Sequence, residues 1–272
     1  MIKMRGLARA AVVTAIAGTV GGAAVLAGQA VLARARRYAK PDLRLAMRSA
    51  VGSAGAQPLH LVLLGDSTAL GVGVDKMIDT VGGQLAQLLA EAHSGAAALS
   101  YGGREARRVE LSSVAVAGSR SADLGTQVAR ALVGPRPDIA VILVGANDAV
   151  RFARIGEAAE HLGTAVRRLR TAGVCVVVGT VPDLGAARAF APPLRHLVGW
   201  QGRRLAWAQA IAVRAADGVP VDLAGQTGAV FRADAGTYCH DGYHPSADGY
   251  RVWAHALLPA VTDAATMPRR SA

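Results

Sequence analysis

The sequence contains few cysteines and few charged residues. Its 272 residues include two cysteines, Cys175 and Cys239. Two cysteines are too few for a disulfide-stabilised scaffold or for a zinc site built from a cysteine cluster. Charged residues make up 18% of the chain and hydrophobic residues 52%, which excludes a disordered protein, a collagen-like chain and a coiled coil. The length suits one large globular domain or two small ones.

Acidic residues are nearly missing from the first 50 residues, which contain nine Lys/Arg and one acid, Asp42. Residues 51–272 carry 21 basic and 18 acidic residues and are close to neutral for their size. Most of the net charge of +11 therefore lies in the N-terminal fifth of the chain. Because a nucleic-acid-binding domain needs a basic face on its folded part, we expect no nucleic-acid partner.

An uncharged run of 24 residues extends from Ala10 to Ala33. As a helix with a rise of about 1.5 Å per residue, it would cross the roughly 30 Å hydrocarbon core of a bilayer. Basic residues flank the run on both sides, as is typical near lipid headgroups. We therefore expect residues 1–48 to hold an N-terminal membrane helix, residues 10–33, and favour an uncleaved single-pass anchor. A cleaved signal peptide and a buried alanine-rich helix are the alternatives.

The side of the membrane on which the rest of the chain lies stays open. The count of basic residues favours the flank that follows the run, which would leave the domain in the cytoplasm. A signal peptide would instead export the domain to the cell envelope. Residues 49–58, rich in glycine, alanine and serine, are typical of a linker.

From residue 59 onward, short apolar runs alternate with segments of helical spacing. The apolar runs predict five strands: Leu59–Leu64, Val109–Ala117, Ile139–Val144, Val174–Val178 and Val219–Leu223. The helical segments are Val81–Ala92, Ser121–Val133, Phe152–Ala172, Leu194–Ala216 and Ala247–Val261. This alternation predicts one α/β domain, residues 59–263, with a parallel sheet between two layers of helices, followed by a tail at 264–272.

Polar and small residues follow the first three predicted strands, where parallel sheets bind their ligands. Ser67 ends a Gly-Asp-Ser block, Gly118 follows the second strand, and Asn147 lies in a Gly-Ala-Asn-Asp block after the third. Together they offer a hydroxyl, unhindered backbone N–H groups and an amide donor. Taken alone, each block is more typical of a helix cap or a βα turn.

Near the C-terminus, Asp241 and His244 lie three residues apart in a turn that ends at Pro245. At that spacing Asp241 can accept the Nδ1 proton of His244, which leaves Nε2 facing a nucleophile. Cys239 and His240 beside them allow a rival interpretation as metal ligands, but their spacing matches no known zinc pattern. We therefore expect no metal and no cofactor.

The four blocks together supply a nucleophile, hydrogen-bond donors and an Asp–His pair, which acyl transfer requires. Their order and spacing resemble the four blocks of the SGNH (GDSL-type) hydrolase superfamily. The resemblance covers about Leu59 to Val261. It implies a flavodoxin-like, three-layer α/β/α sandwich with a five-stranded parallel sheet.

The resemblance also implies a catalytic triad. Ser67 would be the nucleophile, His244 the general base, and Asp241 the residue that orients His244. The chain departs from the family pattern at Thr68, where leucine gives the family its name.

The oxyanion hole implied by the resemblance consists of the backbone N–H groups of Ser67 and Gly118 and the side chain of Asn147. Asp66 and Asp148 would be structural supports. The block around Gly118 lacks the asparagine that often precedes this glycine in the family.

The expected function is that of a serine esterase or lipase-like hydrolase that cleaves carboxylic esters through an acyl-serine intermediate. The alternative is an acyltransferase or deacetylase that acts on a cell-envelope carbohydrate or lipid with the same residues. The segment Asp183–Arg204 mixes apolar and basic residues, so it is either a wall of an acyl pocket or the start of an amphipathic helix. The expected partners are a small-molecule ester or an acylated lipid or glycan, and the membrane.

Overall fold

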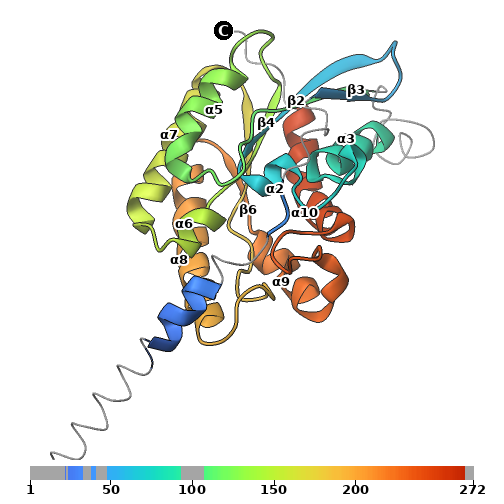
Figure 1. The fold of residues 1–272 in the computed structure, drawn as a ribbon. Coiled ribbons are helices and arrows are strands. Elements are labelled where there is room, and N and C mark those ends of the chain that lie inside the picture. Colours follow the sequence, from blue (N-terminus) through green and yellow to red (C-terminus); the bar gives the residue numbers. More distant parts are fainter. Residues whose placement is uncertain (1–21, 23, 33–37, 41–47, 93–106, 267–272) are drawn as a thin grey trace, which may run out of the picture.

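The computed structural model describes residues 22, 24–32, 38–40, 48–92 and 107–266 (Figure 1). Most of the predicted membrane segment, most of its basic flanks, and residues 267–272 of the predicted tail lie outside these ranges. Within them, no helix is both long enough and apolar enough to span a membrane. The membrane helix therefore stays a prediction.

The sheet is mixed and has six strands, so the prediction of a five-stranded parallel sheet was wrong. The strands are β1 (Arg48–Val51), β2 (Gln57–Gly65), β3 (Arg107–Ser113), β4 (Ile139–Leu143), β5 (Cys175–Gly179) and β6 (Val219–Val221). Their order is β1-β3-β2-β4-β5-β6, in which β1 runs antiparallel to β3 and the other neighbours are parallel. The parallel part follows the flavodoxin-like order.

The additional strand, β1, comes from the end of the predicted membrane segment and the start of the predicted linker. Its sequence is RSAV, and its residues alternate between exposed and half-buried. Such a short edge strand forms by backbone pairing with β3 and needs no apolar run of its own. For that reason hydrophobic patterning does not reveal it.

Helices cover both faces of the sheet (Figure 1). One face packs against α3 (Val81–Ala92) and α10 (Ala247–Thr266), with α9 (Leu223–Ala233) beside them. The other face packs against α5 (Leu124–Ala131), α7 (Ile155–Thr171) and the end of α8 (Leu194–Arg214). Helix α10 continues to Thr266, so it includes the first residues of the predicted tail.

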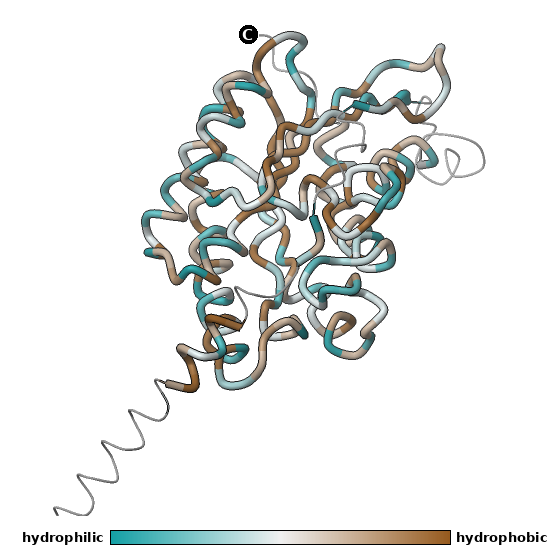
Figure 2. Tube along the Cα trace, in the orientation of Figure 1, coloured by the Kyte–Doolittle hydropathy of each residue, from teal (hydrophilic) through white to brown (hydrophobic). Residues whose placement is uncertain are grey.

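The central strands are buried on both faces. In β2, Leu61 and Leu63 belong to the cluster under α3 and α10, whereas Val62 and Leu64 belong to the cluster under α5 and α7. All five residues of β4 are buried. Figure 2 shows this apolar interior, with hydrophilic residues on the outer surfaces of the helices. The strands therefore form a rigid platform.

Four parallel strands end in register, which brings their following residues to one edge of the sheet. Gly65 pairs with Leu143, Leu143 with Gly179, and Gly179 with Val221. Gly65 has a φ of +132°, and a Cβ there would lie 1.8 Å from the Leu143 carbonyl oxygen. Only glycine fits this turn, which directs the chain from β2 into the short helix α2 (Ser67–Leu70).

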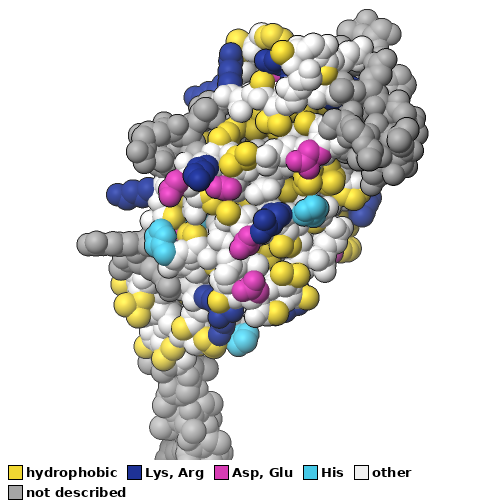
Figure 3. Space-filling model, turned by 90° about the vertical axis from the view of Figure 1, so that its right-hand side faces the viewer, with side chains coloured by type: hydrophobic (Ala, Val, Ile, Leu, Met, Phe, Trp, Pro, Cys, Tyr) yellow, Lys and Arg dark blue, Asp and Glu magenta, His cyan; other side chains and the backbone are white. Residues whose placement is uncertain are grey.

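The surface over α3, α9 and α10 carries charges of both signs. On the face that Figure 3 displays, basic and acidic side chains of the described residues are interspersed among hydrophobic ones. The strongly basic part of the sequence lies instead in its first 50 residues.

Candidate active site

A chain of hydrogen bonds links Ser67, His244 and Asp241 at the carboxyl edge of the sheet. Ser67 is the first residue of α2, and the other two lie in the loop between the turn Ala235–Thr237 and α10. His244 Nε2 lies 2.9 Å from Ser67 Oγ, and His244 Nδ1 lies 2.7 Å from Asp241 Oδ2. All three side chains are buried. The structure therefore brings these three predicted site residues into direct contact.

The Asp241 carboxylate is surrounded by donors. Its Oδ1 accepts hydrogen bonds from the backbone N–H groups of Tyr243 and His244 and from the Cys239 thiol. Its Oδ2 accepts from the His244 ring and from the Ala39 N–H. Burial acts to raise the pKa of Asp241, but the hydrogen bonds from the His244 ring and the backbone amides outweigh it and hold the pKa well below its ordinary value. An ionised carboxylate only accepts, so His244 Nδ1 carries the proton and Nε2 is the acceptor.

The three residues predicted to form an oxyanion hole, Ser67, Gly118 and Asn147, line one cavity. The Ser67 N–H begins α2, so it has no acceptor within the helix. Gly118 and Asn147 line the same cavity as Ser67 and His244. Gly118 has a φ of +82°, and a Cβ there would meet no other atom of the described residues within 4 Å. The Asn147 amide donates one hydrogen bond to the Ser119 carbonyl (3.1 Å), which leaves its second N–H for a ligand.

The Gln127 side chain links the end of β2 to the loop that carries Gly118. Hydrophobic patterning does not identify this residue. Its Oε1 accepts from the Gly65 N–H (2.7 Å), and its Nε2 donates to the Gly65 carbonyl and to Ser119 Oγ. The end of β2 is thereby fastened to the loop that carries Gly118. The available sequence signal is a glutamine among the buried positions of α5.

Asp148 fixes the position of the short helix α6 (Ala146–Val150) that carries Asn147. Its Oδ2 accepts from the backbone N–H (2.9 Å) and the hydroxyl (3.1 Å) of Ser121. Burial raises the pKa of Asp148, and the two hydrogen bonds from Ser121 act against that rise. These contacts suit the predicted supporting role.

Asp66 caps α2 directly before Ser67. Its Oδ1 accepts from the Thr68 N–H (2.9 Å) and the Thr68 hydroxyl (2.8 Å). Burial raises the pKa of Asp66 from 3.8 to about 6, although the hydrogen bonds from Thr68 lower it. Keeping this carboxylate ionised at neutral pH therefore costs stability.

We expect Asp66→Asn to stabilise the fold at neutral pH. Between pH 3.8 and about 6 the folded state binds more protons at Asp66 than the unfolded state, so this group lowers stability as the pH rises through that interval. Asparagine keeps the Oδ1 acceptor without the charge. The expected gain at pH 8 is on the order of 2 kcal/mol, and it should vanish below pH 4. Thermal unfolding of the wild type and the variant between pH 4 and 8 measures this gain in stability. A variant less stable than the wild type at pH 8 would contradict the expectation.

The cavity in front of Ser67 has a volume of about 400 Å³. Ser67, His244 and Asn147 contribute polar groups to its lining, and most of the other lining residues, among them Phe190 and Leu194, are apolar. A volume of this size falls within the range of small-molecule sites. Phe190, Leu194 and Val198 of the segment Asp183–Arg204 line this cavity, and the segment also contains the start of α8.

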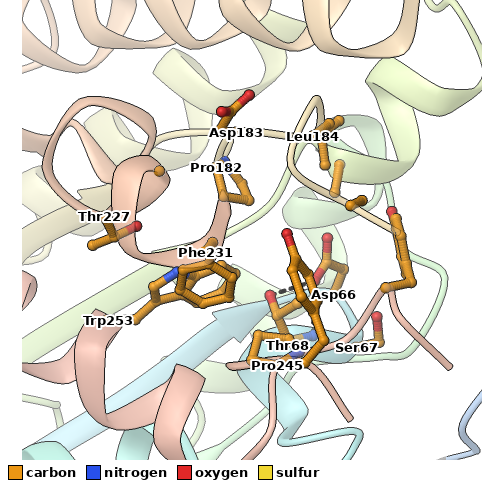
Figure 4. A pocket seen from close by; sticks show the side chains of 15 residues that line it. Asp66, Ser67, Thr68, Pro182, Asp183, Leu184, Thr227, Phe231, Pro245 and Trp253 are labelled. Carbon is orange, nitrogen blue, oxygen red and sulfur yellow. Dashed lines mark hydrogen bonds between the residues drawn. The ribbon is translucent and has the colours of Figure 1, made fainter. Parts of the chain in front are cut away.

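A second, much smaller cavity of about 30 Å³ lies on the Asp66 side of Ser67 (Figure 4). Phe231 and Trp253 form one side of it, with Asp66 and Thr68 opposite them, as Figure 4 shows. This volume holds about one water molecule. Of these two cavities, the larger one therefore offers more room for a ligand.

The remaining predicted features concern metals and cysteines. Within the described ranges, no group of three or more His, Cys, Asp or Glu side chains could hold a metal ion. Cys175 and Cys239 are both free thiols. Burial raises the pKa of Cys239 to about 11, so at neutral pH it is a protonated donor to Asp241.

Comparison with known proteins identifies the family. The model of the GDSL-like lipase/acylhydrolase family matches residues 63–252. The chain belongs to this family. The matched segment contains every predicted site residue, from Asp66 to His244.

Relatives of this GDSL-like chain agree with the assignment. A GDSL-like esterase of Mycobacterium tuberculosis is 43% identical over 210 residues, which cover 76% of this chain. The matched region spans 63% of that relative's length.

Solved structures of similar fold include a lipase/acylhydrolase from Enterococcus faecalis, with a TM-score of 0.59 at 18% identity over 79% of this chain and 100% of that one. They also include an acetylxylan esterase from Geobacillus stearothermophilus, with a TM-score of 0.54 at 17% identity over 78% of this chain and 95% of that one. At these identities the likeness establishes the fold of the GDSL-like domain alone.

Proposed function

We propose that this GDSL-like protein is a serine esterase that cleaves carboxylic esters through an acyl-serine intermediate. The observation that carries the proposal is the hydrogen-bond chain from Asp241 through His244 to Ser67 Oγ. In this chain Ser67 is the nucleophile, His244 the general base and Asp241 the group that holds the imidazole in the required tautomer. Membership in a lipase/acylhydrolase family supports the same reaction.

Acylation follows from the position of each proton. His244 Nε2 takes the Ser67 hydroxyl proton as Oγ attacks the ester carbonyl carbon. The carbonyl oxygen then carries a negative charge, which the N–H groups of Ser67, Gly118 and the Asn147 amide stabilise. When the C–O bond to the alcohol breaks, His244 gives its proton to the leaving oxygen. Water attacks the acyl-serine by the same sequence, releases the acid and restores Ser67.

We expect Asn147→Ala to lower kcat by about 10²–10³-fold with little change in KM, because the amide stabilises charge that develops only in the transition state. The amide also holds the Ser119 carbonyl at 3.1 Å, so thermal unfolding should accompany the kinetics. Steady-state rates on a soluble ester measure the effect. A rise in KM at unchanged kcat would assign Asn147 to substrate binding instead.

The substrate we propose is an ester with an apolar acyl chain, such as an acylated lipid. The cavity of about 400 Å³ exceeds the needs of an acetyl group, and Phe190, Leu194 and Val198 give it an apolar wall. Ala30, from the uncharged run at residues 10–33, lines the same cavity. The end of this run therefore lies at the proposed acyl site.

The alternative function, an acyltransferase or a deacetylase of an envelope carbohydrate, uses the same residues. The acetylxylan esterase among the proteins of similar fold illustrates this possibility. The size of the cavity favours the longer acyl group.

The decisive experiment measures hydrolysis of p-nitrophenyl esters of two to twelve carbons by the full-length chain in detergent. We expect turnover with an optimum above two carbons. An optimum at acetate would favour the deacetylase. Folded protein that hydrolyses no ester, but transfers an acyl group to added sugar acceptors, would favour the transferase.

A further inference from the structure

The chain that follows the N-terminal uncharged run returns to the active site. The Ala39 N–H donates a hydrogen bond of 2.9 Å to Asp241 Oδ2, across 202 residues of sequence. This oxygen also accepts the His244 Nδ1 proton. Two donors from distant parts of the chain therefore fix one carboxylate oxygen.

Tyr38 lies against the loop that carries His244. Its ring packs edge-on against Tyr243, with centroids 5.5 Å apart, and stands edge-on 6.4 Å from the His244 imidazole. Tyr243 in turn packs edge-on against Phe190, and both rings line the cavity. Tyr38 thus continues the apolar wall up to the catalytic histidine.

The preceding residues are attached to the same wall. Gln29 Nε2 donates to the Pro192 carbonyl (2.6 Å), and its Oε1 accepts from the Leu194 N–H (3.1 Å) at the start of α8. Leu26 packs against the cluster that contains Phe190 and Leu194. Figure 1 shows the helix of residues 24–32, in blue, beside the start of α8. The segment is therefore held by side-chain contacts at both Gln29 and Tyr38.

We propose that this N-terminal segment, residues 26–32 and 38–40, is part of the active site and sets its preference for apolar acyl chains. Tyr38 and Ala30 complete the wall along which the acyl chain lies, and Ala39 positions Asp241 through its N–H. The inference rests on the proposed esterase function. According to this inference, the predicted anchor and the catalytic domain act as one functional unit. The substrates of the site are then esters with acyl chains longer than acetate.

The wall is tested by Tyr38→Ala in the full-length chain, with octanoate and acetate esters of p-nitrophenol as substrates. Loss of the ring removes contacts that only the longer chain makes, so the ratio of kcat/KM for octanoate over acetate should fall about tenfold. Trp207→Ala is the matched control, because Trp207 is 72% exposed on α8 and does not line the cavity. It should leave the ratio unchanged.

The role of the Ala39 N–H in positioning Asp241 is tested by comparing two variants. Ala39→Pro removes the N–H, and Ala39→Gly keeps it. Loss of one hydrogen bond to a charged group should lower kcat about tenfold for both esters at similar KM. Ala39→Gly should retain several times more activity than Ala39→Pro. Thermal unfolding of each variant separates a loss of kcat from a loss of folded protein.

The outcomes separate this inference from the esterase proposal. If wild type hydrolyses both esters and Tyr38→Ala keeps the wild-type ratio, the wall assignment is overturned while the esterase stands. If folded Ala39→Pro equals Ala39→Gly in kcat, Ala39 does not position Asp241. If folded wild type hydrolyses no ester in the series, the esterase proposal fails and this inference fails with it. A tenfold drop in the ratio for Tyr38→Ala alone supports the wall even if Ala39→Pro does not fold.

Discussion

Ser67→Ala is expected to abolish ester hydrolysis by this chain, with a fall in kcat on the order of 10⁶-fold. The Ser67 hydroxyl is the only group in the proposed mechanism that forms a covalent bond with the substrate. Its removal leaves the oxyanion donors and the cavity intact, so substrate binding should persist and residual turnover should come from water alone. The assay uses the full-length protein and the ester chain length with the highest turnover.

The fold should tolerate this change. Among the described residues, Ser67 Oγ has one hydrogen bond, to His244 Nε2, and alanine suits the first turn of α2. Ser53→Ala, at an exposed loop position before β2, is the matched control and should keep wild-type activity. Ser67→Ala protein that is folded and retains more than a hundredth of the wild-type kcat would remove Ser67 from the nucleophile role.

The strands and the position of the site could be predicted because both depend on strong local signals. Runs such as Ile139–Leu143 contain only apolar residues, and a strand buried on both faces permits nothing else. The turn after β2 needs glycine, because a Cβ at Gly65 would collide with the Leu143 carbonyl. Both signals depend on the type of residue at given positions. The sequence therefore predicts the edge of the sheet at which Ser67 and Asn147 lie.

Helix α9 was missed because its sequence works against helix formation. The sequence predicts a fifth strand up to Leu223, whereas β6 ends at Val221 and Asp222 caps α9 by accepting from the Gly225 N–H. Gly225 and Gly228 lower the helix propensity of the segment. Gly228 lies close to Asp183, where a Cβ would come within 3.1 Å, so tertiary packing favours glycine in this helix.

The contribution of the N-terminal segment had no signal in residue type. The Ala39 contact uses a backbone N–H, which every residue except proline offers. The type of residue at position 39 therefore does not indicate that this contact forms. Gln29 and Gln127 likewise bond to backbone atoms that sequence patterns do not place. The separation of the chain into anchor, linker and domain followed composition, whereas the contacts of Tyr38 and β1 cross those boundaries.

Asp241→Asn is expected to lower kcat about 10⁴-fold, because it reverses the tautomer of His244. With the asparagine Oδ1 held by the Tyr243 and His244 backbone N–H groups, its NH₂ group takes the place of Oδ2. A donor at that position cannot accept from His244 Nδ1, so Nδ1 must become the acceptor and Nε2 must carry the proton. Nε2 then faces Ser67 Oγ as a donor and cannot remove the hydroxyl proton.

The same substitution places the asparagine NH₂ against a second donor, the Ala39 N–H, which bonds to Oδ2 in the wild type. We therefore expect Asp241→Asn to lose stability as well as activity, whereas Asp248→Asn, at an exposed position outside the cavity, should change neither by much. Rates and thermal unfolding of both variants measure the two effects. The double variant Asp241→Asn with Ala39→Pro separates them further: removal of the Ala39 donor relieves the clash, so stability should partly recover while kcat stays low. Wild-type kcat in folded Asp241→Asn would show that His244 reaches its working tautomer without Asp241.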